Sequence, residues 1–196
     1  QIEPFLKELT VVDSFEHLPR VAALEDNRLR ASAGQDAYVV GLDSAQVGQR
    51  YLVVRPTVRY ALPQPSTDLD ARGKHISGAG NLWANYIPQS GRNEALGFEL
   101  ARVNVGTVTA LPGGKVDVAT LSLEDSGNEV RAGDRLMPVQ AQPYDLQFFP
   151  HPPAAQTLSS DVRVLAVTDM FTTGGRRDVI AISAGHNDGV DNGTVF

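Results

Sequence analysis

Short apolar runs separated by polar turns that contain glycine or proline constrain the fold of this chain more than any other feature. The runs lie at residues 37–42, 50–55, 105–111, 115–121, 160–168 and 179–182. The 196-residue chain contains 18 Gly and 12 Pro, a composition typical of many short strands joined by turns. We therefore expect a mainly β fold of small barrel-like or sandwich-like β modules, with short helices at the N-terminus and in an insertion.

Changes of pattern along the chain divide it into four predicted parts. These are an N-terminal helical lead-in at 1–26, a β module at 27–138 with an insertion at 62–92, a Pro-rich connector at 139–159 and a second β module at 160–196. The lead-in is expected to be helical because Ile2, Phe5, Leu6 and Leu9 recur at helical spacing. We expect the second module to be incomplete at its C-terminal end, or to pack into the first. Because the chain begins at Gln1 rather than Met, we expect it to be a piece of a longer protein.

Turn residues predict where individual strands end. Pro112-Gly113-Gly114 separates the runs 105–111 and 115–121, which predicts a β-hairpin. Pro56 is expected to close the strand at 50–55. Three turns share the form apolar-x-x-Gly-x-x-apolar, with their glycines at Gly48, Gly133 and Gly193. The pattern indicates one strand-turn-strand device used three times, with glycine at the bend and the final apolar residue entering a core.

Charge and cysteine content exclude several classes of function. The formal net charge of −6 argues against nucleic acid as a partner, since a polyanion is repelled by an acidic chain. The absence of cysteine excludes disulfides, thiolate metal sites and cysteine nucleophiles. No apolar run approaches the roughly 18 residues of a membrane span, so membrane insertion is not expected.

Candidate catalytic and metal-binding residues do not form a recognisable constellation in the sequence. The histidines, His17, His75, His151 and His186, lie far apart, and none sits in an H-E-x-x-H pattern. Around His186, the residues HNDG are accounted for by turn chemistry, in which Asn and Asp hydrogen-bond nearby backbone. We therefore expect no catalytic residue, no metal and no cofactor.

Two aromatic residues of the insertion, Trp83 and Tyr86, are the candidate binding residues. Exposed aromatic faces can stack on sugar rings or anchor a partner protein. The alternative is a structural role for Trp83, in which the indole is a hydrophobic peg that ties the long insertion to the β module.

Four segments of the chain, taken in order, resemble part of a known family. They are NRLRASAGQDAYVVGLDSAQVGQRYLVVRP at 27–56, ALGFELARVNVGTVTAL at 95–111, EVRAGDRLMP at 129–138 and DVIAISAGHNDGVDNGTVF at 178–196. Together they resemble the region downstream of the LysM domain in a family of bacterial LysM-containing envelope proteins. The last segment is also similar to the C-terminal β module of the flagellar assembly protein T family.

The resemblance implies a location and a class of partner. In that family the LysM domain precedes this region and binds the glycan strands of peptidoglycan. This chain contains no recognisable LysM domain, so its implied partners are peptidoglycan, through a LysM domain outside this chain, or envelope proteins. The implied location is the periplasm or cell envelope.

These observations favour a non-catalytic accessory or scaffold domain of a periplasmic, cell-wall-associated LysM protein that interacts with protein or peptidoglycan. Two alternatives stay open. One is a cell-wall remodelling enzyme whose site the sequence does not reveal, and the other is a module for self-association or partner docking.

Overall fold

The computed structural model describes residues 9–61, 95–113, 117–125, 128–139, 149–153, 161–167, 175–176 and 178–196. These residues are mainly β, as the sequence predicts. The strands are β1 (Leu9–Val12), β2 (Arg20–Leu24), β3 (Asp36–Val40), β4 (Arg50–Ala61), β5 (Ala95–Ala110), β6 (Ala119–Leu123), β7 (Arg135–Pro138), β8 (Val164–Val167) and β9 (Ile180–Ile182). Two short 3-10 helices, η1 (Glu25–Asn27) and η3 (His186–Asp188), complete the described elements.

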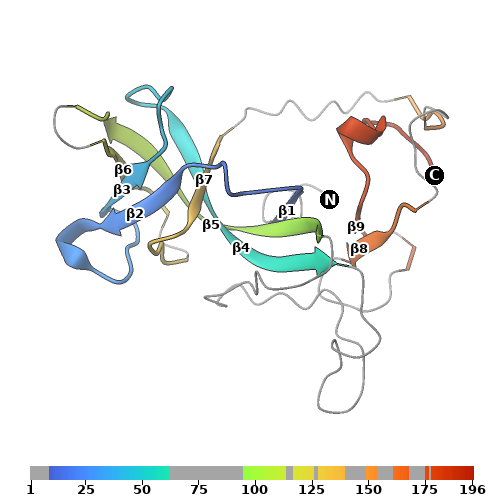
Figure 1. Cartoon of the computed structure of the whole chain (residues 1–196), viewed down its shortest axis with the longest axis horizontal. Coiled ribbons are helices and arrows are strands. Elements are labelled where there is room, and N and C mark those ends of the chain that lie inside the picture. The colour runs from blue at the N-terminus through green and yellow to red at the C-terminus, as the bar shows by residue number, and fades with distance from the viewer. Residues whose placement is uncertain are drawn as a thin grey trace, which may run out of the picture.

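Six antiparallel strands close into a small barrel (Figure 1). The seven-stranded sheet has the order β1-β5-β4-β7-β2-β3-β6, and β6 also pairs with β5, which joins the two ends of the ring. Because the ring is closed, each of these six strands has a pairing partner on both sides. The predicted barrel-like module is therefore confirmed.

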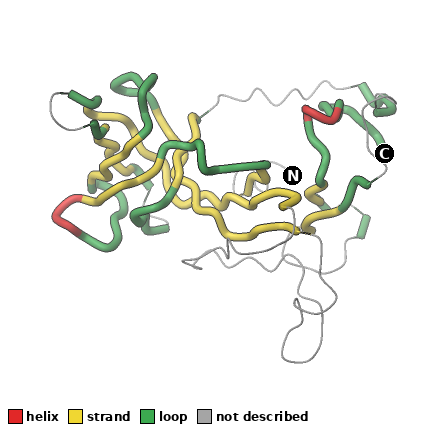
Figure 2. Tube along the Cα trace, viewed as in Figure 1, coloured by secondary structure: helices red, strands yellow, loops and turns green. Residues whose placement is uncertain are grey.

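The longest strand, β5, serves both the barrel and a second β-structure. Its C-terminal half pairs with β6, from Gly106 to Ala110, whereas its N-terminal half pairs with β1, from Phe98 to Ala101. Beyond that N-terminal half lies the two-stranded sheet of β8 and β9 (Figures 1 and 2). A Cβ built on Gly97 of β5 would contact the side chains of Val11 and Leu165, so this end of β5 packs closely between β1 and β8.

The barrel interior is a continuous apolar core. Its members are Val21, Leu24, Ala31, Ala37, Val39, Leu42, Ala45, Tyr51, Val53, Val103, Val108, Ala119, Leu121, Leu123, Val130 and Leu136. A smaller cluster of Phe15, Val54 and Leu100 lies beside it, with Phe98 packed edge-on against Phe15 at a ring distance of 5.0 Å. The second cluster fixes the 13–19 segment on the barrel, which matters for the site described below.

The predicted N-terminal helical lead-in is wrong over the residues that the structure describes. Leu9 is the first residue of β1, and β2 pairs with both β3 and β7, so the barrel begins well before Asn27. The only helical turn there is η1, in which Asp26 has a positive φ of 55°. Pairing with distant strands, β1 with β5 and β2 with β3 and β7, makes this stretch extended. Residues 1–8 and the insertion, where the other helical predictions fall, lie outside the described residues.

Two strand predictions have different outcomes. The hairpin is confirmed, since β5 and β6 pair antiparallel on either side of the predicted turn. The prediction that Pro56 closes its strand is wrong, because β4 continues to Ala61. The register against β5 shifts between Pro56 and Val58. An irregularity of this kind accommodates a residue that has no N–H to donate to the ladder.

Among the described residues, four turns share one construction, and we call them the glycine turns. They occupy 32–35, 46–49, 131–134 and 191–194. In each, the fourth residue donates its N–H to the carbonyl of the first, and its own side-chain oxygen accepts the N–H of the first. The third residue is a glycine at φ +77° to +100°, a conformation that type II turns need and that other residues rarely adopt.

Three of the glycine turns confirm the repeat that the sequence suggests, and the turn at 32–35 is a further copy with the same spacing, beyond the three that were predicted. Its flanking residues, Ala31 and Ala37, are buried in the barrel core, as are Ala45 and Tyr51 around the second turn. The expected core position after the fourth turn differs, because Phe196 is 67% exposed.

A buried ion pair joins β4 to the third glycine turn. Arg55 donates from Nε to Asp134 Oδ1 at 2.7 Å and from Nη2 to Oδ2 at 2.8 Å, and both side chains are about 95% buried. Asp134 Oδ2 also accepts the Arg131 N–H, and Arg55 Nη2 donates to the Glu129 carbonyl. The carboxylate therefore holds the turn and the guanidinium together in a fork geometry.

Gly106 is required by the close approach of β5 and β6. A Cβ at this position would lie 2.7 Å from Leu121 Cγ and 2.9 Å from the Ser122 carbonyl oxygen. We expect Gly106→Ala to lower the free energy of unfolding by about 1–3 kcal/mol, because the fully buried Leu121 has no free space to move into. Urea titration followed by circular dichroism measures the change.

Gly113→Ala is the matched control, since its nearest neighbour outside the adjoining residues is a carbonyl oxygen 3.9 Å from the added Cβ. Its unfolding free energy is expected to change by about 1 kcal/mol or less. Equal effects of the two substitutions would contradict the packing argument.

The buried ion pair predicts an ordered set of stabilities. Arg55→Met is expected to cost about 3–5 kcal/mol, because it leaves the Asp134 carboxylate buried without its counter-charge. Adding Asp134→Asn should recover part of that loss, since a neutral amide can still accept the Arg131 N–H. The exposed pair Arg30–Glu129 is the control, and Arg30→Met should cost about 1 kcal/mol or less. Chemical denaturation of all variants tests the order.

Candidate functional site

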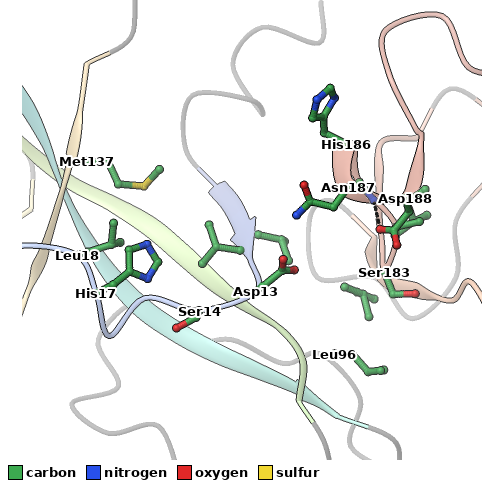
Figure 3. Close-up of a pocket in the computed structure, with 16 residues that line it drawn as sticks. Asp13, Ser14, His17, Leu18, Leu96, Met137, Ser183, His186, Asn187 and Asp188 are labelled. Atoms are coloured by element: carbon green, nitrogen blue, oxygen red, sulfur yellow. Dashed lines mark hydrogen bonds between the residues drawn. The ribbon is translucent and has the colours of Figure 1, made fainter. Parts of the chain in front are cut away.

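A cleft of about 470 Å³ lies between the barrel and the second β-structure (Figure 3). One wall comes from β1 and the segment that follows it, and the other from β9 and η3, with contributions from β5, β7 and β8. The lining residues are Val11, Val12, Asp13, Ser14, His17, Leu18, Leu96, Met137, Leu165, Ile182, Ser183, Ala184, Gly185, His186, Asn187 and Asp188. Eight of these residues are apolar and seven are polar or charged, so the cleft has a mixed lining.

The barrel wall of the cleft is held in place by aromatic packing. Phe15 is buried in the smaller apolar cluster, and the exposed Asp13, Ser14 and His17 lie around it in the sequence. The Arg135 guanidinium lies 5.4 Å from the centre of the Phe15 ring, a cation–π arrangement. Because Phe15 anchors this segment, the polar side chains beside it are presented from a fixed backbone.

Arg135 lies next to Leu18, one of the residues that line the cleft, and its charge is influenced by several neighbours. Its Nη1 donates to the Leu18 carbonyl at 3.4 Å. Arg20 is its direct cross-strand neighbour on β2. Burial, and next the positive charge of Arg20, lower the pKa of the Arg135 guanidinium from its ordinary value, whereas the charge of Glu16 acts in the opposite direction. Like charges at directly opposed positions destabilise a sheet, so the pairing of Arg20 with Arg135 is unfavourable for the barrel.

The second wall is a capped turn. The Asp188 carboxylate accepts the Gly185 N–H at 2.9 Å, and the Gly189 N–H donates to the His186 carbonyl. Gly189 has φ +76°, which closes η3 in a left-handed conformation. The turn chemistry predicted for this stretch is thus confirmed for Asp188. Asn187 behaves differently, since its side chain reaches across the cleft toward β1 (Figure 3).

The histidines are distributed over separate parts of the molecule. His17 lies beside Leu18 and Met137, whereas the His186 ring points away from the cleft on the opposite wall (Figure 3). His151 pairs with Asp191 at 3.0 Å, a contact 40 residues apart in sequence that no local pattern announces. His75, and with it the candidate binding residues Trp83 and Tyr86, lies outside the described residues. Within the described part of the chain, no three His, Asp or Glu side chains are grouped to hold a metal ion.

A cluster of polar side chains at the C-terminal half of β4 is hydrogen-bonded within the protein. It consists of Thr57 and Tyr60 of β4 and Glu99 of β5. Glu99 accepts from Thr57 Oγ1 at 2.6 Å and from Tyr60 Oη at 2.5 Å. Burial, followed by the hydrogen bond to Glu99 and the charge of that carboxylate, raises the pKa of Tyr60 above its ordinary value. The cluster thus links β4 to β5 through side chains as well as backbone.

The raised pKa of Tyr60 makes stability depend on alkaline pH. The folded-state pKa lies above the unfolded value of about 10, so the contribution of the neutral phenol is complete below about pH 10 and is lost as the pH rises further. We expect the free energy of unfolding to fall more steeply above about pH 10 in the native chain than in Tyr60→Phe. Urea titrations at a series of pH values measure this difference.

Tyrosinate absorbance supplies the control. At about pH 11, Tyr60→Phe should leave the absorbance of the folded protein unchanged, because Tyr60 stays protonated there. In urea the same substitution should remove one of five titrating phenols. Loss of one titrating phenol from the folded protein would show that Tyr60 ionises normally.

Comparisons with known proteins add no relative. No family model, no curated protein and no solved structure matches the chain. The described residues contain no helix with the length and apolar character needed to cross a membrane. The resemblance to LysM-containing envelope proteins and to the flagellar assembly protein T family therefore stays a prediction, and function is argued from the cleft.

Proposed function

We propose that this chain is a non-catalytic accessory module of a periplasmic, cell-wall-associated protein, and that it binds a partner in the cleft between the barrel and the second β-structure. The observation that carries the proposal is the composition of that cleft. Two walls from separate β-structures present apolar side chains, including Leu18, Met137 and Leu165, together with a similar number of polar or charged ones. Such a surface suits a segment of an envelope protein, which offers both apolar side chains and backbone polar groups.

The buried polar side chains form their hydrogen bonds inside the protein, and this supports a binding or scaffold role. The buried polar and charged side chains Arg55, Thr57, Asn104 and Asp134 are each hydrogen-bonded within the protein. Asn104 shows the pattern clearly, since it donates to the Asp125 carbonyl at 2.7 Å and accepts the Val105 N–H at 2.9 Å. These groups stabilise the barrel.

The proposed location rests on the order of the four segments that resemble the LysM-containing envelope family. A LysM domain outside this chain would hold the whole protein on peptidoglycan, and this module would then position a second envelope component against the cell wall. In this arrangement the cleft binds protein, and peptidoglycan is bound elsewhere in the whole protein.

Blocking the cleft tests the proposal. Ser14→Tyr places a bulky side chain on an exposed cleft position, and it should weaken binding of an envelope protein at least about tenfold, which corresponds to about 1.4 kcal/mol. Binding is measured by cross-linking and quantitative pull-down from an envelope extract, and parallel sedimentation with purified peptidoglycan measures glycan binding. The unfolding free energy should be unchanged.

The matched control is Ser44→Tyr, which makes the same change at an exposed turn position outside the cleft lining. It should bind as the native chain does. Equal binding by both variants would refute a role for the cleft, and release of muropeptides from the peptidoglycan would refute a non-catalytic module.

A further inference from the structure

Each glycine turn of the barrel also forms two backbone hydrogen bonds with a single residue of a neighbouring strand. We call this pair of hydrogen bonds a grip, and the strand residue the gripped residue. In the first turn the Gly34 N–H donates to the Leu123 carbonyl at 2.9 Å, and the Leu123 N–H donates back to the Gln35 carbonyl at 3.0 Å. The gripped residue thus exchanges both of its backbone groups with the third and fourth residues of the turn.

The second and third glycine turns repeat this arrangement. Gly48 donates to the Val108 carbonyl at 2.8 Å, and Val108 donates to the Gln49 carbonyl at 2.9 Å. Val21 is gripped in the same way by the third turn, with both hydrogen bonds at 2.8 Å. The gripped residues Leu123, Val108 and Val21 are apolar, lie in strands and are at most 2% exposed. The turn therefore selects one apolar residue of an extended strand.

The fourth glycine turn, 191–194, has the same internal hydrogen bonds, but no residue in the described part of the chain is held by it. The Asp191 N–H is bound by Thr194 Oγ1 at 3.1 Å, and Gly193 has φ +100°. No described residue accepts the Gly193 N–H or donates to the Thr194 carbonyl, the two groups that hold the strand in the other copies. The opposite edge is occupied, because His151 donates to the Gly193 carbonyl and accepts the Val195 N–H.

The surroundings of the fourth glycine turn are apolar and exposed. Val195 is 56% exposed and Phe196 is 67% exposed, whereas the residue that occupies the Phe196 position in the other copies is buried in the core. Unpaired backbone groups beside exposed apolar side chains are the features by which an incoming strand is recognised at a sheet edge.

We propose that the fourth glycine turn is a docking site for an extended apolar β-strand of a partner protein. One apolar residue of that strand accepts the Gly193 N–H and donates its own N–H to the Thr194 carbonyl, as Val21, Val108 and Leu123 do within the barrel. The inference rests on the proposed role in partner binding and names the kind of segment recognised. Valine or leucine fits the gripped position because the three internal examples have those residues.

The test uses a strand whose grip is already seen in the barrel. The probe is a synthetic peptide, LPRVAALED, which copies residues 18–26 and carries the valine that stands for Val21. Added to the full 196-residue chain, it should slow hydrogen exchange of the Gly193 amide at least about tenfold, since that N–H becomes hydrogen-bonded. Nuclear magnetic resonance measures the exchange residue by residue.

One change to the probe and a matched pair of substitutions in the turn make the result specific. An N-methyl group on the probe's valine removes the N–H that Thr194 would accept, and it should weaken binding about tenfold. Gly193→Ala, which cannot adopt φ +100° without strain, should abolish protection, whereas Asn192→Ala in the same turn should retain it. Equal binding of the methylated probe, or protection confined to barrel amides, would overturn the proposal.

The other possible occupant is a second copy of the chain. Light scattering that shows a dimer in the native chain and a monomer in Gly193→Ala would reassign the turn to self-association and overturn a heterologous partner. The proposed function fails independently. A partner whose binding is lost in Ser14→Tyr but kept in Gly193→Ala would support the cleft and refute strand docking at the turn.

Discussion

The grip of a glycine turn on one residue of a neighbouring strand is the interaction on which the barrel depends. Each grip uses a glycine N–H that is free to point outward because the glycine takes a positive φ, and a side-chain oxygen that fixes the turn from within. Three such grips tie the turns to β6, β5 and β2. Because the gripped residues are core residues, backbone pairing and burial of apolar surface are satisfied at the same points.

Buried polar groups reinforce this arrangement where the sheet is least regular. Asp134 belongs to the third glycine turn and also accepts the fork of Arg55, which lies between two register shifts of β4. Asn104 holds the segment after β6 through the Asp125 backbone. In both cases a side chain supplies hydrogen bonds that the interrupted ladder cannot supply, and unsatisfied buried groups are costly.

The closed barrel and the open two-stranded sheet meet at the cleft. The barrel strands are paired in a ring, whereas β8 and β9 form a two-stranded sheet with outer edges. A two-stranded sheet is stabilised by packing against something else, and here it packs beside β1 and the end of β5. The cleft forms along this junction, and the fourth glycine turn lies in the same C-terminal part of the chain.

Local sequence determined most of the strands and three of the four glycine turns, since alternating apolar residues and glycines at bends are short-range signals. It could not reveal β1 and β2, because their pairing with distant strands, and no local pattern, decides against a helix. The copy at 32–35 has the same spacing, but both of its core residues are alanines, which are weak markers of a buried face.

Only the tertiary structure decided ring closure, the Arg55–Asp134 pair and the cleft. Arg55 and Asp134 are 79 residues apart, and the cleft joins 11–18 to 182–188. No short-range spacing in the sequence therefore predicts the ion pair or the cleft. The physical reason is how far apart in the sequence the interacting groups lie. Turn geometry is set within four residues, whereas the meeting of two strands or two charges depends on the path of the whole chain between them.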